Sequence, residues 1–142
     1  MADLETVKRL GGGDHGLVVI AVARPSGTVH TSVVNAGVLD DPDTGKPCVG
    51  FVAAGGAKKL DHIRASGRVA VVFRSGWEWV SVEGPARVLE RDDRDASAYA
   101  TLLRDIFTAA GGAHDNWDEY DRVMAAEGRT AVVVDPQRIT GP

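Results

Sequence analysis

Short runs of β-branched and other apolar residues, each bounded by turn residues, dominate the chain from end to end. The clearest runs are residues 17–23, 29–38, 49–53, 69–73, 77–89 and 130–134. Glycine, proline, serine and aspartate fill many of the gaps between them, and these residues favour tight turns. Strands of this length pair with their neighbours in sequence and build an antiparallel sheet. We therefore predict a mostly antiparallel β-barrel.

Helical periodicity interrupts the strands at only a few places. Apolar residues recur at helical spacing in residues 4–10, 59–65 and 99–106, and again from Trp117 to Met124. Glycines end the first three segments, and Asn116 is a suitable cap for the fourth. Residues 40–46 form a polar hairpin tip, and the mixed charges of residues 90–95 predict a solvated loop. We expect a mainly β fold with flanking helices in a single domain, residues 1–142.

Charge and cysteine content narrow the classes of function. The 142-residue chain carries 16 Lys and Arg against 20 Asp and Glu, a net charge of −4, and this argues against a general nucleic-acid-binding protein. No apolar stretch is long enough to span a bilayer, and charges interrupt residues 1–10, which lack a signal-peptide core. Cys48 is the single cysteine and lies in an apolar run. It predicts a buried thiol in a cytoplasmic protein.

Several familiar site patterns are misplaced or absent. Gly11, Gly13 and Gly16 match the glycine spacing of dinucleotide-binding loops. Here, however, a helix precedes the loop and a strand follows it, which reverses the order that this chemistry needs. The histidines show no short metal-ligand spacing, so we predict no metal site. Neither a nucleophile elbow nor a P-loop is present, and we assign no catalytic side chain.

One segment has the composition of an anion site. Gly55, Gly56, Ala57, Lys58 and Lys59 lie between an apolar strand and a helix. Glycines let the backbone approach a ligand closely, and the N–H groups at the start of a helix attract anions. Two lysines at the same place add point charges that suit phosphate. From the spacing alone, a strand-to-helix turn with solvated lysines is an equally good interpretation.

The strand that begins at Trp77 alternates with period two. Val80 and Val82 share one face, and Trp77 and Trp79 share the other. If the valines line the barrel core, both tryptophans project outward. An outward tryptophan pair marks a ligand or subunit interface, or a surface that helices of the same chain cover.

Several of these segments together resemble the pyridoxamine 5′-phosphate oxidase-like split-barrel superfamily. The resemblance is carried by residues 32–37, 50–52, 55–59, 62–64, 76–84 and 116–124, and it covers nearly the whole chain. Within the superfamily the chain is most similar to the flavin/deazaflavin oxidoreductases of the B group, which use coenzyme F420. The fold that this resemblance implies is the FMN-binding type of split β-barrel.

The resemblance also implies where a cofactor binds. It implies a homodimer with two cofactor sites at the subunit interface, and the cofactor phosphate against the 55–59 loop. Lys59 stands in the family's lysine position, with Lys58 beside it. The ring and tail of the cofactor would follow the second strand, and the partner subunit would contribute residues near its tryptophan pair. The implied cofactor-binding residues are Val33, Val34, Asn35, Gly55, Gly56, Ala57, Lys58, Lys59, Trp77 and Trp79.

The sequence differs from its relatives inside the loop itself. Gly56 and Ala57 stand where relatives often carry arginine, serine or threonine, which moves the expected phosphate contacts toward the backbone. His62 and Ile63 stand where relatives often carry asparagine and leucine. These differences leave coenzyme F420 and FMN both open as the cofactor.

The function that follows is an oxidoreductase that passes hydride from reduced deazaflavin to a conjugated small-molecule acceptor, such as a quinone, an unsaturated lactone or a tetrapyrrole. The cofactor supplies this chemistry, which explains why no acid, base or nucleophile stands out. Two alternatives stay open. One is an FMN-dependent oxidase or reductase of the same superfamily, and the other is a non-catalytic carrier of cofactor or haem. A third alternative is a structural dimer whose lysine loop is accidental.

Overall fold

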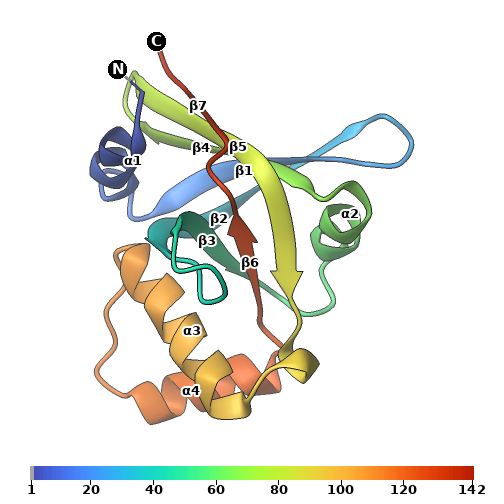
Figure 1. Ribbon diagram of the computed structural model, residues 1–142. Coiled ribbons are helices and arrows are strands. Elements are labelled where there is room, and N and C mark those ends of the chain that lie inside the picture. The colour runs from blue at the N-terminus through green and yellow to red at the C-terminus, as the bar shows by residue number, and fades with distance from the viewer. Residues whose placement is uncertain (1) are drawn as a thin grey trace.

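The described part of the chain, residues 2–142 of a computed structural model, consists of seven strands, four α-helices and one short 3-10 helix (Figure 1). The elements in chain order are α1 (Leu4–Gly11), β1 (Leu17–Ala23), β2 (Val29–Asp40), β3 (Pro47–Ala53), α2 (Lys58–Ser66), β4 (Arg68–Ser75), β5 (Glu78–Leu89), η1 (Arg91–Asp93), α3 (Ala96–Ala109), α4 (Trp117–Ala126), β6 (Thr130–Val134) and β7 (Arg138–Thr140). Among residues 2–142, none of the helices combines the length and apolar character that a bilayer crossing requires.

Six of the strands close into an antiparallel barrel. They follow the order β4, β1, β2, β3, β6, β5, and β5 pairs with β4 to complete the circle. The seventh strand, β7, lies outside the barrel and pairs with β5 from Ser81 to Glu83. The predicted fold class, a mostly antiparallel split barrel with flanking helices, is therefore confirmed.

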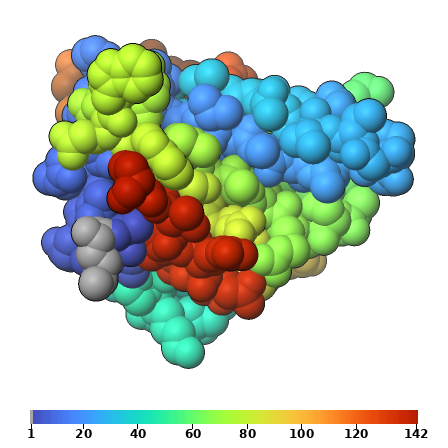
Figure 2. Space-filling model, turned by 90° about the horizontal axis from the view of Figure 1, so that it is seen from above, coloured from blue at the N-terminus to red at the C-terminus, as the bar shows by residue number. Residues whose placement is uncertain are grey.

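The β1–β2 hairpin is the longest projection of the molecule. Its register runs from Leu17 opposite Asn35 to Ala23 opposite Val29. Gly27 closes the turn with a φ of 92°, a left-handed conformation that favours glycine. The tip extends well beyond the barrel in both views (Figures 1 and 2).

Two hydrophobic cores lie on opposite sides of the barrel wall. The first fills the barrel interior, and α1 and α2 close it with Val7, Leu10, Leu60 and Ile63. The second lies between the outer face of the barrel and the helices α3 and α4 (Figure 1). Strand β6 is buried throughout and serves both cores, because its alternate residues face opposite ways. Val132 and Val134 belong to the inner core, whereas Ala131 and Val133 belong to the outer one.

Most of the expected elements are present, with ends shifted by a few residues. Strand β2 continues two residues past the predicted end, to Asp40, and α2 begins at Lys58 rather than at residue 59. The charge run at residues 90–95 differs more from its prediction. It contains η1, and Arg94 is only partly exposed because it binds Asp43. Strand β7 was not predicted from the sequence. Cys48 is buried, as expected.

Candidate functional site

The lysine loop turns the chain from β3 into α2. Ala57 is the N-cap of α2 and has no side chain that could accept a hydrogen bond, whereas α1, α3 and α4 are capped by Asp3, Asp95 and Asn116. Helix α2 therefore starts without a side-chain acceptor for its first N–H groups. Lys58 and Lys59 both belong to the first turn, the position where a helix favours an anion.

The loop packs tightly against the turn that follows α4. A Cβ atom on Gly55 would lie 2.4 Å from the carbonyl oxygen of Gly128, so only glycine allows this approach of the two backbones. The contact brings Arg129 close to Lys59. Burial and the charge of Arg129 lower the pKa of Lys59 below its ordinary value. Two cations from distant parts of the chain thus share one corner of the molecule.

A cavity of about 220 Å³ lies between the barrel and the helices α3 and α4. It is lined by Asn35, Val52, Ile106, Phe107, Ala110, Tyr120, Met124 and Arg129. Arg129 is the one charged residue in this lining, and most of the other residues are apolar. A second hollow adjoins the cavity and shares Asn35, Phe107 and Ala110 with it. The cavity therefore provides an apolar space beside the cationic corner.

An aromatic cluster forms the helical wall of the cavity. The ring of Tyr120 lies 5.0 Å from Phe107 and 5.3 Å from Trp117, measured between ring centroids. The Tyr120 hydroxyl donates to the carbonyl oxygen of Leu103 at 3.2 Å. Burial raises the pKa of Tyr120, so its hydroxyl stays protonated near neutral pH. The wall can hold a flat apolar group and offers no catalytic base.

The three predicted residues of β2 face different ways. Val34 is buried in the barrel core, so its side chain cannot contact a ligand on the outer surface. Asn35 faces outward and lines the cavity, and its Nδ2 atom donates to the carbonyl oxygen of His15 at 2.9 Å. Val33 is 60% exposed and lines a separate depression with residues of β1 and β4.

Trp79 projects outward as its spacing predicts, and Trp77, which lies in the turn before β5 and not in the predicted strand, is exposed as well. Val80 and Val82 are fully buried in the barrel, whereas Trp77 is 98% and Trp79 is 39% exposed. Both line a shallow depression with Val72 and Arg74, and neither lines the cavity beside Lys59. Within one chain, the predicted cofactor residues therefore form two separate groups.

An uncovered apolar surface lies around the tryptophan group. It is formed by outward side chains of β1, β2, β4, the β4–β5 turn and the start of β5, namely Leu17, Val19, Val33, Val72, Trp77 and Trp79. We call this set the outer apolar face. Helices α3 and α4 cover the outer surface near β3 and β6 instead. The outer apolar face is the kind of surface that marks a protein interface.

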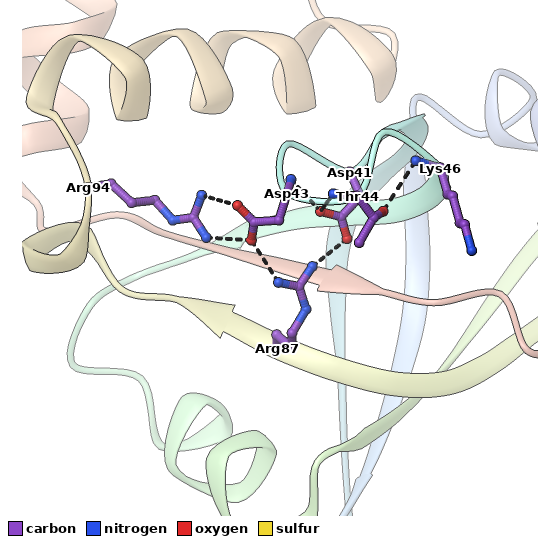
Figure 3. Close-up of polar contacts among 6 residues, drawn as sticks. All are labelled: Asp41, Asp43, Thr44, Lys46, Arg87 and Arg94. Atoms are coloured by element: carbon purple, nitrogen blue, oxygen red, sulfur yellow. Dashed lines mark hydrogen bonds and ion pairs between the residues drawn. The ribbon is translucent and has the colours of Figure 1, made fainter.

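A charge network joins the β2–β3 turn to β5 and the start of α3 (Figure 3). The Asp43 carboxylate accepts hydrogen bonds from Arg94 at 2.7 and 2.9 Å and from Arg87 at 2.8 Å. These two guanidinium groups, Arg94 first, lower the pKa of Asp43 to about 2. Arg87 also binds Asp41, which accepts the backbone N–H of Asp43 at 2.8 Å. The carboxylates are occupied by the chain itself, which makes the network structural.

Neither Arg129 nor the cavity wall was predicted from the sequence. The available signal for Arg129 was a basic residue directly after Gly128, which ends a helix. Only the fold shows that this turn meets Gly55. As for metals, residues 2–142 contain no group of three His, Cys, Asp or Glu side chains placed to hold an ion.

Fold and site together define a closed antiparallel barrel with a helical cover and a cationic loop beside an apolar cavity. Residues 8–141 match the family model described as pyridoxamine 5′-phosphate oxidase, and the chain belongs to this family. The corresponding superfamily of split barrels includes flavin-dependent oxidases and reductases as well as haem-binding proteins. No curated protein matches the chain in sequence.

Solved structures with the same fold include proteins of different kinds. A conserved hypothetical protein from Mycobacterium tuberculosis has a TM-score of 0.67 and 17% identity, over 94% of this chain and 81% of its own. A protein described as an F420 reductase has a TM-score of 0.60 and 17% identity, over 90% of this chain and 91% of its own. The haem storage protein of Vibrio cholerae has a TM-score of 0.60 and 10% identity, over 99% and 95%. These similarities establish the shared fold.

Proposed function

We propose that the protein is an oxidoreductase that transfers hydride from reduced coenzyme F420 to a conjugated organic acceptor, such as a quinone, an unsaturated lactone or a tetrapyrrole. The observation that carries this proposal is that Lys59, in the uncapped first turn of α2, lies close enough to Arg129 to feel its charge, and that Arg129 lines an apolar cavity. A cofactor with one phosphate and a flat ring needs both features side by side. The similarity to an F420 reductase agrees with this reading.

The residues present suit such a cofactor. Lys58, Lys59 and the backbone of Gly55 and Gly56 would hold its phosphate, because they combine positive charge with close backbone access. Asn35 would hydrogen-bond to a polar edge of the ring or tail. When bound, the reduced deazaflavin supplies the hydride.

The remaining part of the reaction falls to the protein's own groups. The walls formed by Phe107 and Tyr120 exclude water from the cavity and orient a flat acceptor, which lowers the entropic cost of the transfer. Arg129 pairs with Glu127 through its Nε atom at 2.9 Å, and its remaining N–H groups can stabilise negative charge that develops on the acceptor. The Tyr120 hydroxyl already donates to the carbonyl oxygen of Leu103, so we assign the proton of the reaction to solvent.

We further propose a homodimer in which the partner completes each site. The outer apolar face provides the contact surface, and it includes the tryptophans that lie apart from the lysine loop within one chain. A second copy packed on this face would bring its own tryptophan pair toward the cofactor. The single buried thiol, Cys48, is compatible with the reducing cytoplasm, where we place the protein.

Substitution of the loop lysines tests the proposed site. We expect the double substitution Lys58→Ala and Lys59→Ala to weaken F420 binding at least tenfold, because each lost charge-assisted hydrogen bond costs about 1.5–3 kcal/mol. Lys8 and Lys46 are the other two lysines of the chain. Replacing both by alanine gives a control with the same change in net charge. Fluorescence titration of the purified proteins measures the affinity, and equal affinities for the two double variants would contradict the assignment.

Two measurements separate the proposal from its alternatives. FMN carries a single phosphate too, so titration with FMN and F420 in parallel identifies the preferred cofactor. Tighter binding of FMN would move the assignment to an FMN-dependent enzyme. Loss of reduced-F420 absorbance after addition of a quinone, an unsaturated lactone or a tetrapyrrole demonstrates turnover. Tight binding without loss of absorbance for any of these acceptors would favour a carrier of cofactor or haem.

A further inference from the structure

Two histidines lie next to the lysine loop and play no part in the proposed reaction. His30 is near the start of β2, and His62 is on α2, three residues after Lys59. Their ring centroids are 5.8 Å apart. The Nε2 atom of His30 lies 3.3 Å from the hydroxyl of Ser32. Both rings are partly buried, so β2 and α2 hold the pair in place.

The pair lies among cations that have no acidic partner. No carboxylate in residues 2–142 lies within ion-pairing distance of Arg24, Lys58 or Lys59. The guanidinium of Arg24 instead donates to the Thr28 hydroxyl and the carbonyl oxygen of Val29. In a chain with a net charge of −4, such a concentration of uncompensated positive charge is unexpected.

The nearby carboxylates are already occupied. Asp61 is on α2 and Glu90 follows β5, and both bind Arg64. The charges that act on His30 are those of Arg24, Lys59 and His62, and none of them is negative. Burial and these three groups lower the pKa of His30 below its ordinary value. In the free protein, burial first and the cationic neighbours second therefore favour the neutral form of the His30 imidazole.

We propose that His30, in its protonated form, and its neighbour His62 bind a second anionic group of the same ligand whose phosphate lies against the lysine loop. The identity of that ligand rests on the function proposed above. The class of ligand is an organic phosphate that carries at least one further acidic group. An anion placed among these cations supplies the missing negative charge and allows the His30 imidazole to take up a proton.

This arrangement makes binding depend on pH with a definite sign. A bound anion raises the pKa of His30, and protonated His30 therefore binds the anion more tightly. If the shift on binding is about one pH unit for a single histidine, affinity falls by up to about tenfold as pH rises through the range of histidine titration. A ligand that occupies only the lysines lacks this dependence.

Sulfate is a suitable probe, because it stays a dianion between pH 5.5 and pH 8 and contributes no titration of its own. We expect the histidine ring signals of the full protein, followed by NMR, to show a higher pKa for His30 in the presence of sulfate. The dissociation constant of sulfate should increase about tenfold from pH 5.5 to pH 7.5. In the variant with His30→Gln and His62→Gln, the constant should not change with pH. The control with His15→Gln and His114→Gln removes two distant histidines and should behave as wild type.

Sulfate and cofactor results distinguish this inference from the proposed function. Suppose that F420 binding depends on the lysines, but that the dissociation constant of sulfate keeps the wild-type pH dependence in both double histidine variants. The histidine subsite is then wrong and the cofactor assignment stands. If sulfate shows the expected linkage but neither F420 nor FMN binds, the anion subsite stands and the cofactor assignment falls. Sulfate binding that is independent of pH in the wild-type protein would overturn the inference directly.

Discussion

Asp43 shows how single side chains stabilise the turn between β2 and β3. Its pKa falls from 3.8 to about 2 in the folded protein because Arg94 and Arg87 bind the charged form. A lowered pKa stabilises the fold above the unfolded value of 3.8, and this contribution disappears as pH falls through about 2. The side chain is 38% exposed, so solvent reduces the effect.

We expect Asp43→Asn to lower the free energy of unfolding by about 1 kcal/mol at pH 7. The difference from wild type should narrow as pH falls from 4 toward 2. Urea denaturation across this pH range measures it. Asp92→Asn, at an exposed position in η1, is the control and should change little. A difference between Asp43→Asn and wild type that stays constant down to pH 2 would mean that the network does not act through the Asp43 charge.

For single residues, the direction of a side chain could be predicted from its neighbours in sequence, but partners far apart in sequence could not. The outward direction of Trp79 followed from period-two alternation, which depends only on its neighbours in sequence. The role of Asp43 depends on Arg87 and Arg94, which are 44 and 51 positions away. The same holds for Arg129 and Lys59, which meet only because two glycine turns touch. Half of the candidate site was therefore visible in the sequence, and its other half required the fold.

One buried hydroxyl forms hydrogen bonds between helix α3 and the barrel. Tyr99 is fully buried, and its hydroxyl accepts the Ala131 N–H at 2.9 Å and donates to the carbonyl oxygen of Leu89 at 2.5 Å. Tyr99→Phe leaves both backbone groups without this partner, so we expect a loss of about 1–3 kcal/mol in unfolding free energy. The urea midpoint should fall with an unchanged slope. Tyr120→Phe loses only one longer bond and should cost less; equal losses would contradict this account.

Elements with their own start and stop signals were predicted well. Asn116 caps α4 through a hydrogen bond from the Glu119 N–H, as the sequence indicated, because capping is a local interaction. Strand β7 lacks such a signal. It has three residues and no alternation long enough to detect, and it is a strand only because β5 offers it an open edge. Its prediction required knowledge of the neighbouring strand.

The outer apolar face of the whole molecule predicts that the protein is a dimer. Val19 and Val33 lie opposite each other in the β1–β2 ladder, and both side chains point outward. We expect the wild-type protein to have twice its chain mass of 15.0 kDa in light scattering. Replacing both valines by lysine should give a folded monomer, because burying two lysines is costly. The control Val123→Lys, on α4, should remain a dimer; a monomeric wild type would exclude this interface.

Strand β6 contributes to both cores, and this has a consequence for how ligands enter. Because alternate residues of β6 pack into the barrel core and under the helical cover, we expect loss of this strand to unfold both layers together. The barrel side of the cavity is thus a rigid floor. We expect an opening that admits a ligand to come from the helical side of the cavity, which includes α4 and the turn at Gly128 that positions Arg129. Entry of a ligand and placement of its charged neighbour are consequently a single motion.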